Sequence, residues 1–181
     1  YSFSVEHMLT SENVIVHKDL VPKGEYESMA IDTLSDNLIL LCKVCNKDRN
    51  SKTVSGYLIK IGDGGRLSKG KHFSLQLEVL SARDKWINNL FKPSAIARKE
   101  STKEWYILSS INRSLVITDD SFKAKEIILL PRQTFEQPEG IGFDINDNMY
   151  ISSEAGQQSY GMIYKFNVLK LIGVCENKEN H

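Results

Sequence analysis

Residues 137–154 read QPEGIGFDINDNMYISSE, and they contain the pattern from which the fold can be inferred. Apolar residues alternate with polar or small ones on both sides of the polar segment 144–148. Alternation with a period of two is typical of a half-buried β-strand, and Asp and Asn are common in turns. The stretch therefore predicts two short strands, Gly140–Ile145 and Met149–Ser153, joined by a tight turn.

The turn itself has the D-x-N-x-N start of an EF-hand calcium loop. Such a loop needs Gly at its sixth position and Glu at its twelfth. Met149 and Ala155 occupy those positions here. We therefore interpret Asp144–Asn148 as a hairpin turn and not as an EF-hand.

The same organisation recurs earlier in the chain. Segments 26–32 and 93–99 align with 138–144, and each is followed by two further apolar strands. A period of about 40–50 residues with four short strands is typical of a β-propeller blade. Small residues stand at one equivalent position of the three first strands, namely Ala30, Ala97 and Gly142. We expect them to suit the crowded innermost strand of each blade.

Period-two alternation predicts short strands throughout the chain, separated by clusters of Asp, Asn, Gly, Ser and Lys. They are Val14–Leu20, Glu27–Asp32, Leu38–Val44, Gly56–Ile61, Ser74–Val79, Ser94–Arg98, Trp105–Ile111, Leu115–Asp119, Glu126–Leu130, Gly140–Ile145, Met149–Ser153 and Met162–Val168. The first repeat interval is longer than the second, and we assign the excess to a turn at 51–53, a loop at 62–71 and a helical insert at 81–90.

These patterns predict an all-β chain, a β-propeller of four-stranded antiparallel blades in a single domain over 1–175 with a polar tail at 176–181. The expected blade units are approximately 1–20, 26–79, 93–130 and 138–169. Residues 1–5 match the third strand of the last unit, so we expect about three blades plus part of another. Because unpaired sheet edges favour association, we expect missing blades or self-association to cover the open sides.

Composition and charge limit the function classes. Lys and Arg together number 23, as do Asp and Glu, so the formal net charge is zero at pH 7. A nucleic-acid-binding protein usually carries an excess of basic charge, so this balance argues against that class. The longest uncharged apolar run, Ile127–Pro131, is far shorter than the ~18 residues of a membrane-spanning helix, so no transmembrane span is expected.

The stretch 137–144, followed by 148–154, resembles the pattern QPEGI-x-FD … LYI-x-SE of the bacterial SdiA-regulated family. Segments 26–32, 92–97, 106–110 and 114–119 resemble other parts of that family. The sequence departs from the family pattern at Ser28, where Gly is usual, and Lys43 stands where Glu154 stands in the last unit. The resemblance implies a six-bladed propeller of unknown activity, exported or membrane-associated in the cell envelope of a bacterium.

Polar residues that open the first strand of each unit are the candidate ligands of a metal ion. They are Glu27, Ser94 and Glu139, and propeller symmetry brings equivalent positions to one end of the axial channel. Oxygen ligands suit a hard cation, so we expect Ca²⁺ or Mg²⁺ there, with Glu154 as a further carboxylate. The alternative is that Glu27 and Glu139 bond backbone amides at blade junctions and that Glu154 is a solvated strand end.

Cys42 and Cys45 form a CxxC pair inside a strand-like run. In a regular strand, residues three apart point to opposite faces and lie about 10 Å apart, which is too far for a disulfide. The chain has no second CxxC or paired His that would complete a zinc site. We therefore expect two plain strand cysteines, with metal or redox chemistry as the alternative.

Two functions remain open at this stage. The first is a non-enzymatic, exported binding module that takes a small ligand, an ion or an envelope protein through its channel face. The alternative is a propeller hydrolase of the esterase, lactonase or phytase kind, in which a divalent metal activates water. No catalytic residue is assigned, because no G-x-S-x-G elbow or H-E-x-x-H motif is present in the sequence.

Overall fold

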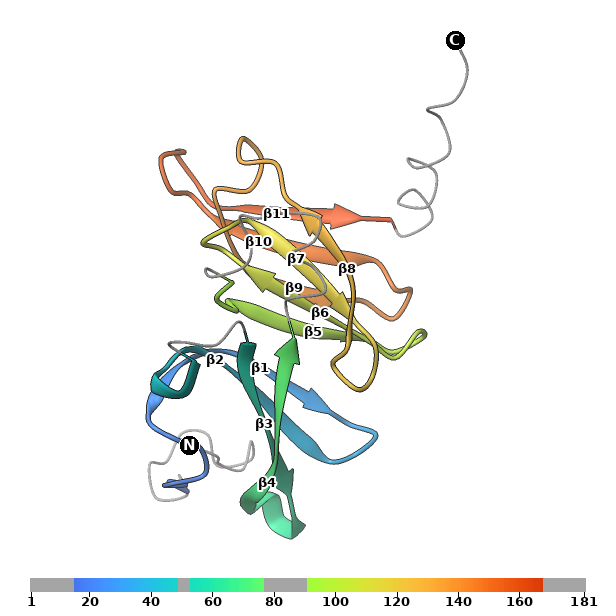
Figure 1. Cartoon of the computed structure of the whole chain (residues 1–181). Coiled ribbons are helices and arrows are strands. Elements are labelled where there is room, and N and C mark those ends of the chain that lie inside the picture. Colours follow the sequence, from blue (N-terminus) through green and yellow to red (C-terminus); the bar gives the residue numbers. More distant parts are fainter. Residues whose placement is uncertain (1–14, 49–52, 77–90, 168–181) are drawn as a thin grey trace.

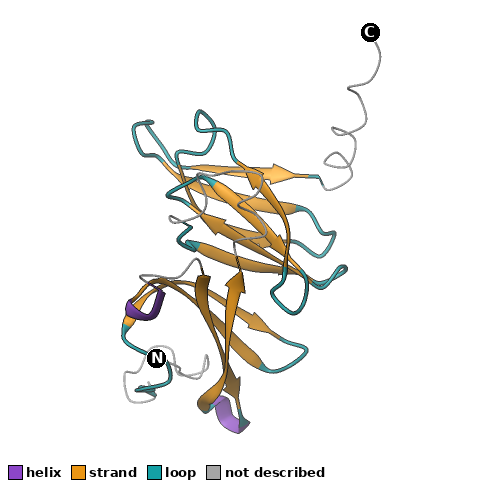
Figure 2. Cartoon of the chain, in the orientation of Figure 1, coloured by secondary structure: helices purple, strands orange, loops and turns teal. Residues whose placement is uncertain are grey.

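The computed structural model of the chain describes residues 15–48, 53–76 and 91–167. Within them, eleven strands form three antiparallel sheets (Figure 1). The match of residues 1–5 to a blade strand and the helical insert at 81–90 lie outside the described residues. Figure 2 shows that the ordered elements are almost entirely strands, with two short 3-10 turns, η3 (Asn46–Asp48) and η4 (Asp63–Gly65).

Each sheet is a meander in which strands pair in the order of the sequence. The first sheet contains β1 (Gly24–Asp32), β2 (Asn37–Cys45), β3 (Thr53–Ile61) and β4 (Leu67–Gln76). The second contains β5 (Ala95–Lys99), β6 (Glu104–Ser109), β7 (Ser114–Thr118) and β8 (Ala124–Leu129). The third contains β9 (Gln137–Phe143), β10 (Met149–Glu154) and β11 (Met162–Phe166).

The first strands of the three sheets are neighbours in space. Strand β5 contacts β1 on one side and β9 on the other. Successive antiparallel meanders whose first strands face one another are the arrangement of blades around a propeller axis. The expected β-propeller blades are therefore present, and Ala30, Ala97 and Gly142 lie on the three innermost strands.

The core lies between the sheets, and the middle sheet is covered on both faces. Ile107 packs toward the first sheet, in one cluster with Ile39 and Leu41. Leu108, the next residue, packs toward the third sheet, in one cluster with Ile151. Successive strand residues point to opposite faces, so this arrangement requires apolar residues at consecutive positions. That requirement explains why β7 is buried along its whole length.

Stacked aromatic rings fill the space between the first two sheets. Phe122 stacks on Phe73 at 3.8 Å between ring centroids and on Trp105 at 5.4 Å. Phe122 follows β7 and has a φ of 63°, so a turn residue in the left-handed region places this ring. The outer faces are less covered, since Met29 on β1 is 63% exposed and Ile163 on β11 is 77% exposed.

Most expected strands are found with ends shifted by a few residues, but three expectations were wrong. Residues 16–20 form no strand, because Asp19 has a φ of 60° and interrupts the extended backbone. The expected loop at 62–71 is shorter, because η4 closes a tight hairpin and β4 already begins at Leu67. The expectation that a crowded position requires a small residue at Gly142 was wrong, because a Cβ added there would meet no atom within 4 Å.

Candidate functional site

Glu27 and Glu139 occupy the same kind of position, a β-bulge near the start of an inner strand. Pairing of β1 with β2 steps from Tyr26 to Ser28 and leaves Glu27 as the extra residue. Pairing of β9 with β10 steps from Pro138 to Gly140 and leaves Glu139 as the extra residue. A bulge redirects the side chain of its extra residue. The two carboxylates predicted from the repeat are therefore structurally equivalent.

Ser94 stands at the corresponding place just before β5. Its backbone N–H donates to the Leu108 carbonyl oxygen at 2.9 Å, and Leu108 is also the pairing partner of Ala95, the first residue of β5. Its hydroxyl donates to the Pro138 carbonyl oxygen at 2.9 Å, and the residue is only 4% exposed. Ser94 therefore joins the start of β5 to the start of β9 through its hydroxyl group.

Glu139 and Glu154 lie close enough to share a hydrogen bond between their side chains. Partial desolvation is the largest cause that raises the pKa of Glu139, followed by repulsion from Glu154, this shared hydrogen bond and repulsion from Glu27. The structure thus brings three of the four predicted ligands together, and we call Glu27, Glu139 and Glu154 the carboxylate cluster.

Lys43 supplies the local positive charge. Its Nζ lies 2.6 Å from Glu27 Oε2, and its charge partly offsets the rise in the pKa of Glu139. Lys43 is itself the extra residue of a bulge in β2, because Glu25 pairs with Val44 and Tyr26 pairs with Cys42. The two bulge residues of the first sheet therefore face each other. Sequence reasoning treated Lys43 only as a departure from the repeat, although its alignment with Glu154 already placed it at the cluster.

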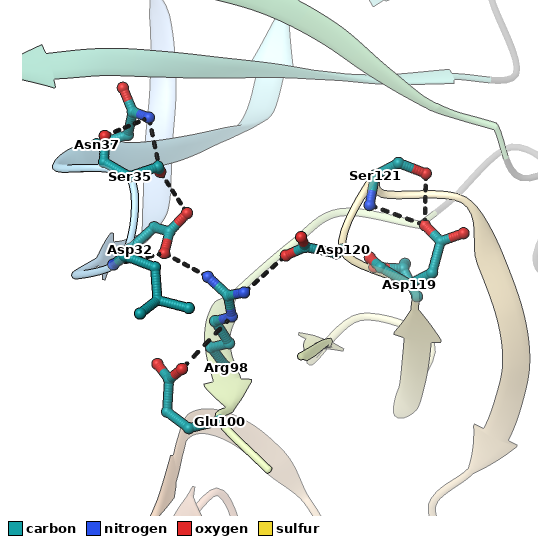
Figure 3. Close-up of polar contacts among 10 residues, drawn as sticks. Asp32, Ser35, Asn37, Arg98, Glu100, Asp119, Asp120 and Ser121 are labelled. Atoms are coloured by element: carbon teal, nitrogen blue, oxygen red, sulfur yellow. Dashed lines mark hydrogen bonds and ion pairs between the residues drawn. The ribbon is translucent and has the colours of Figure 1, made fainter. Parts of the chain in front are cut away.

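At the opposite end of the inner strands, a different charged group, centred on Arg98, joins β5 to β1. Figure 3 shows the Arg98 guanidinium between Asp32, Asp120 and Glu100, and we call these four residues the arginine clamp. The Arg98 side chain is 4% exposed and lies 5.2 Å from the Trp105 ring centroid. It donates to Asp32 at the end of β1 and, at 2.7 Å, to Asp120 after β7.

The carboxylate of Asp144 is occupied by hydrogen bonds from its own turn and from Tyr150. Its oxygens accept bonds from the backbone N–H groups of Asn146 and Asn148, both at 2.9 Å, and from the Tyr150 hydroxyl at 2.9 Å. The Asn148 side chain also donates to Asp144 and is the largest cause of a lowered pKa. Together these donors lower the pKa of Asp144 to about 2. This geometry confirms the hairpin-turn interpretation of Asp144–Asn148.

The expectation of two unbonded strand cysteines was wrong, because Cys42 and Cys45 form a disulfide with their Cα atoms 6.0 Å apart. The distance of about 10 Å assumed a regular strand. The bulge at Lys43 inserts one residue between the two cysteines, turns both sulfur atoms to one side of β2 and shortens the separation. Bulges of this kind depend on the partner strand, so the CxxC spacing alone did not show it.

Two surface cavities lie away from the carboxylate cluster. One of about 490 Å³ lies between residues 19–23 and strands β3 and β4, with Tyr57 and His72 in its wall. The other, of about 730 Å³, lies around η4. Neither of these two cavities is lined by Glu27, Glu139 or Glu154.

Comparison with known proteins names no family for this chain. No family model and no curated protein matches it. Among solved structures, a luciferin-regenerating enzyme is similar with a TM-score of 0.40 and 14% sequence identity. The similar region covers 76% of this chain and 45% of that protein, so the chain spans less than half of its length. A similarity this low transfers no activity, and the propeller architecture rests on the arrangement of the sheets.

Proposed function

We propose that this chain is a propeller-type binding module that holds a hard divalent cation, Ca²⁺ or Mg²⁺, at the carboxylate cluster. The observation that carries the proposal is the pair of equivalent β-bulges that present Glu27 on β1 and Glu139 on β9. Glu154 and Glu27 both lie near enough to raise the pKa of Glu139. Adjacent carboxylates repel each other, and either a shared proton or a bound cation relieves the repulsion. A divalent cation would therefore replace the shared proton.

The residue types of the cluster suit this class of ion. Ca²⁺ and Mg²⁺ take oxygen ligands, and carboxylates are the commonest charged ones. The bulges place two of these carboxylates on β1 and β9, while Glu154 ends β10. Lys43 competes with the ion for Glu27, so the ion has to share or displace that ammonium group.

An exported or cell-envelope location is part of the same proposal. Disulfides persist in oxidising compartments and are rare in the cytosol, which agrees with the bond between Cys42 and Cys45. The stretch 137–154 supports kinship with the SdiA-regulated family. Among the described residues, no helix has the length and apolar character needed to cross a bilayer.

The metal-dependent hydrolase is the weaker candidate. Metal-activated hydrolysis needs an open coordination position beside a cavity that admits the substrate. The two cavities reported above lie elsewhere on the surface. We favour binding without catalysis, because the cluster offers carboxylate ligands for an ion and the sequence assigns no catalytic residue.

Titration calorimetry with Ca²⁺ and Mg²⁺ on metal-stripped protein tests the proposal. We expect the wild type to bind one ion, and Glu139→Gln or Glu154→Gln to weaken binding at least ~10-fold, about 1.4 kcal/mol. Glu126→Gln serves as a matched control, because Glu126 is an exposed strand residue on β8 outside the cluster. Absence of binding by the folded wild type, or equal binding by Glu139→Gln, would contradict the proposal.

A further inference from the structure

A second set of metal-ligating groups lies on the first sheet. The Sγ atoms of Cys42 and Cys45 and a carboxylate oxygen of Asp48 all lie within 4.8 Å of one another. The two cysteines are buried and Asp48 is half-buried, so the group sits inside the protein surface. In the oxidised chain the sulfur atoms are bonded to each other and are not available as thiolates.

We propose that reduction of the Cys42–Cys45 disulfide creates a site for a thiophilic divalent ion such as Zn²⁺, with the two thiolates and the Asp48 carboxylate as ligands. Zn²⁺ prefers four ligands from Cys, His, Asp or Glu, and two thiolates with one carboxylate leave one position for water or an external ligand. This inference is independent of the function proposed for the carboxylate cluster, which uses other residues and a hard ion.

The reductant is a dithiol. One of its thiolates attacks a sulfur of the disulfide, and the resulting mixed disulfide is resolved by its second thiol. The Cys42–Cys45 bond breaks, two electrons and two protons pass to the cysteines, and the reductant becomes a disulfide. Binding of Zn²⁺ then releases the two thiol protons to solvent, since thiolates are the ligands.

The surroundings accommodate the reduced form. Cys42 Sγ lies 3.6 Å from the Glu25 carbonyl oxygen, and Cys45 Sγ lies 3.7 Å from the Tyr26 hydroxyl oxygen. A thiol can donate to these two oxygens, whereas a disulfide sulfur or a metal-bound thiolate cannot, so the contacts suit the reduced form before the metal binds. The Tyr26 hydroxyl donates its own proton to the Pro22 carbonyl oxygen at 2.8 Å, so toward Cys45 it acts as an acceptor.

Asp48 is held in place by a residue that does not belong to the ligand set. Its two oxygens accept bonds from the Ser55 hydroxyl at 2.7 Å and from the Ser55 backbone N–H at 3.0 Å. Such outer contacts orient a ligating carboxylate. Gly24 gives the sulfurs room, because a Cβ there would lie 2.7 Å from Cys45 Sγ and 3.0 Å from Cys42 Sγ.

Cobalt absorption spectroscopy tests this site, with Co²⁺ as the spectroscopic substitute for Zn²⁺. All samples carry Cys175→Ser, so that Cys42 and Cys45 are the only thiols. We expect the dithiol-reduced protein to bind one Co²⁺ with a thiolate-to-cobalt charge-transfer band and tetrahedral visible bands, and Zn²⁺ to displace it. The oxidised protein is expected to show neither band.

Two variants separate ligation from simple thiol chemistry. Asp48→Asn is expected to weaken Co²⁺ binding at least ~10-fold while keeping the charge-transfer band. Asp63→Asn, at an exposed position in η4, is the matched control and should change nothing. The Co²⁺ titration of the chain that carries only Cys175→Ser leaves the proposed ligands intact, and near-ultraviolet circular dichroism reports whether the reduced protein stays folded. Loss of the fold on reduction, absence of the band, or unchanged affinity in Asp48→Asn would overturn the proposal.

Discussion

Acidic side chains lie at both ends of the inner strands β1, β5 and β9, but their negative charge is neutralised differently at each end. At the arginine clamp, three carboxylates face one buried guanidinium, which donates to Asp32 and Asp120 (Figure 3). At the carboxylate cluster, Lys43 pairs with Glu27, while nearby Glu154 and Glu27 raise the pKa of Glu139. In the arginine clamp the cation is a fixed side chain, so this group connects strands. In the carboxylate cluster one ammonium group faces three carboxylates, and we propose that an ion supplies the remaining positive charge.

The largest effect that this contrast predicts is on stability at the clamp. Arg98→Met removes a side chain that is 4% exposed and leaves Asp32, whose side chain is 14% exposed, without its partner. Removing one member of a buried ion pair costs about 3 kcal/mol or more. We expect urea unfolding at pH 7 to show a loss of about 3 kcal/mol.

The matched control for the clamp is Arg66→Met, because Arg66 is exposed beside η4. We expect it to change the free energy of unfolding by less than about 0.5 kcal/mol. If both arginine variants lose the same small amount, the clamp contributes no more than an ordinary surface charge, and the contrast between the two ends fails.

A smaller effect is expected from pH at the carboxylate cluster. The pKa of Glu139 is raised in the folded chain above its ordinary value of 4.5. The folded protein therefore holds a proton that the unfolded chain has released, so the stabilising contribution is complete below 4.5 and is lost as pH rises through the folded pKa. Glu139→Gln removes this titration. Without divalent ions, we expect the variant to gain stability relative to wild type as pH rises, by less than about 1 kcal/mol because the site is exposed to solvent.

Chemical unfolding of both proteins between pH 4 and pH 8, in the presence of a chelator, measures this difference as an order-of-magnitude test. A difference that is constant across the range would contradict a raised pKa of Glu139. The Glu126→Gln variant should run parallel to wild type, since Glu126 lies on β8 away from the cluster.

The smallest effect concerns the ammonium group at the cluster. Lys43→Met removes the charge that competes for Glu27, so we expect Ca²⁺ affinity to rise about threefold, a typical size for one partly exposed charge. Lys60→Met, at an exposed position on β3, is the control and should leave the affinity unchanged. A fall in affinity on substitution of Lys43 would show that the lysine orders the cluster and does not compete with the ion.

Much of the fold could be predicted because its signals are local. Alternation located most of the strands, and the Asp144 turn was recognised from the residues that now hold it. The repeat placed Glu27 and Glu139 at equivalent positions, and the structure agrees because both are bulge residues. The assignment of Gly142 to a crowded position failed, since the space around a side chain depends on strands that are distant in sequence.

The sequence by itself determined the strand pattern, the blade repeat and the residue types at the two ends of the inner strands. Periodicity and turn chemistry act over a few residues, so they can be read directly from the chain. Only the tertiary structure decided which charges meet: Arg98 with Asp32, Glu139 with Glu154, and Lys43 with Glu27. It also decided that Cys42 and Cys45 can bond. Arg98 meets Asp32 because β5 lies beside β1. For the carboxylate cluster and the disulfide, the physical reason is the β-bulge, which arises from the pairing of two strands and redirects side chains.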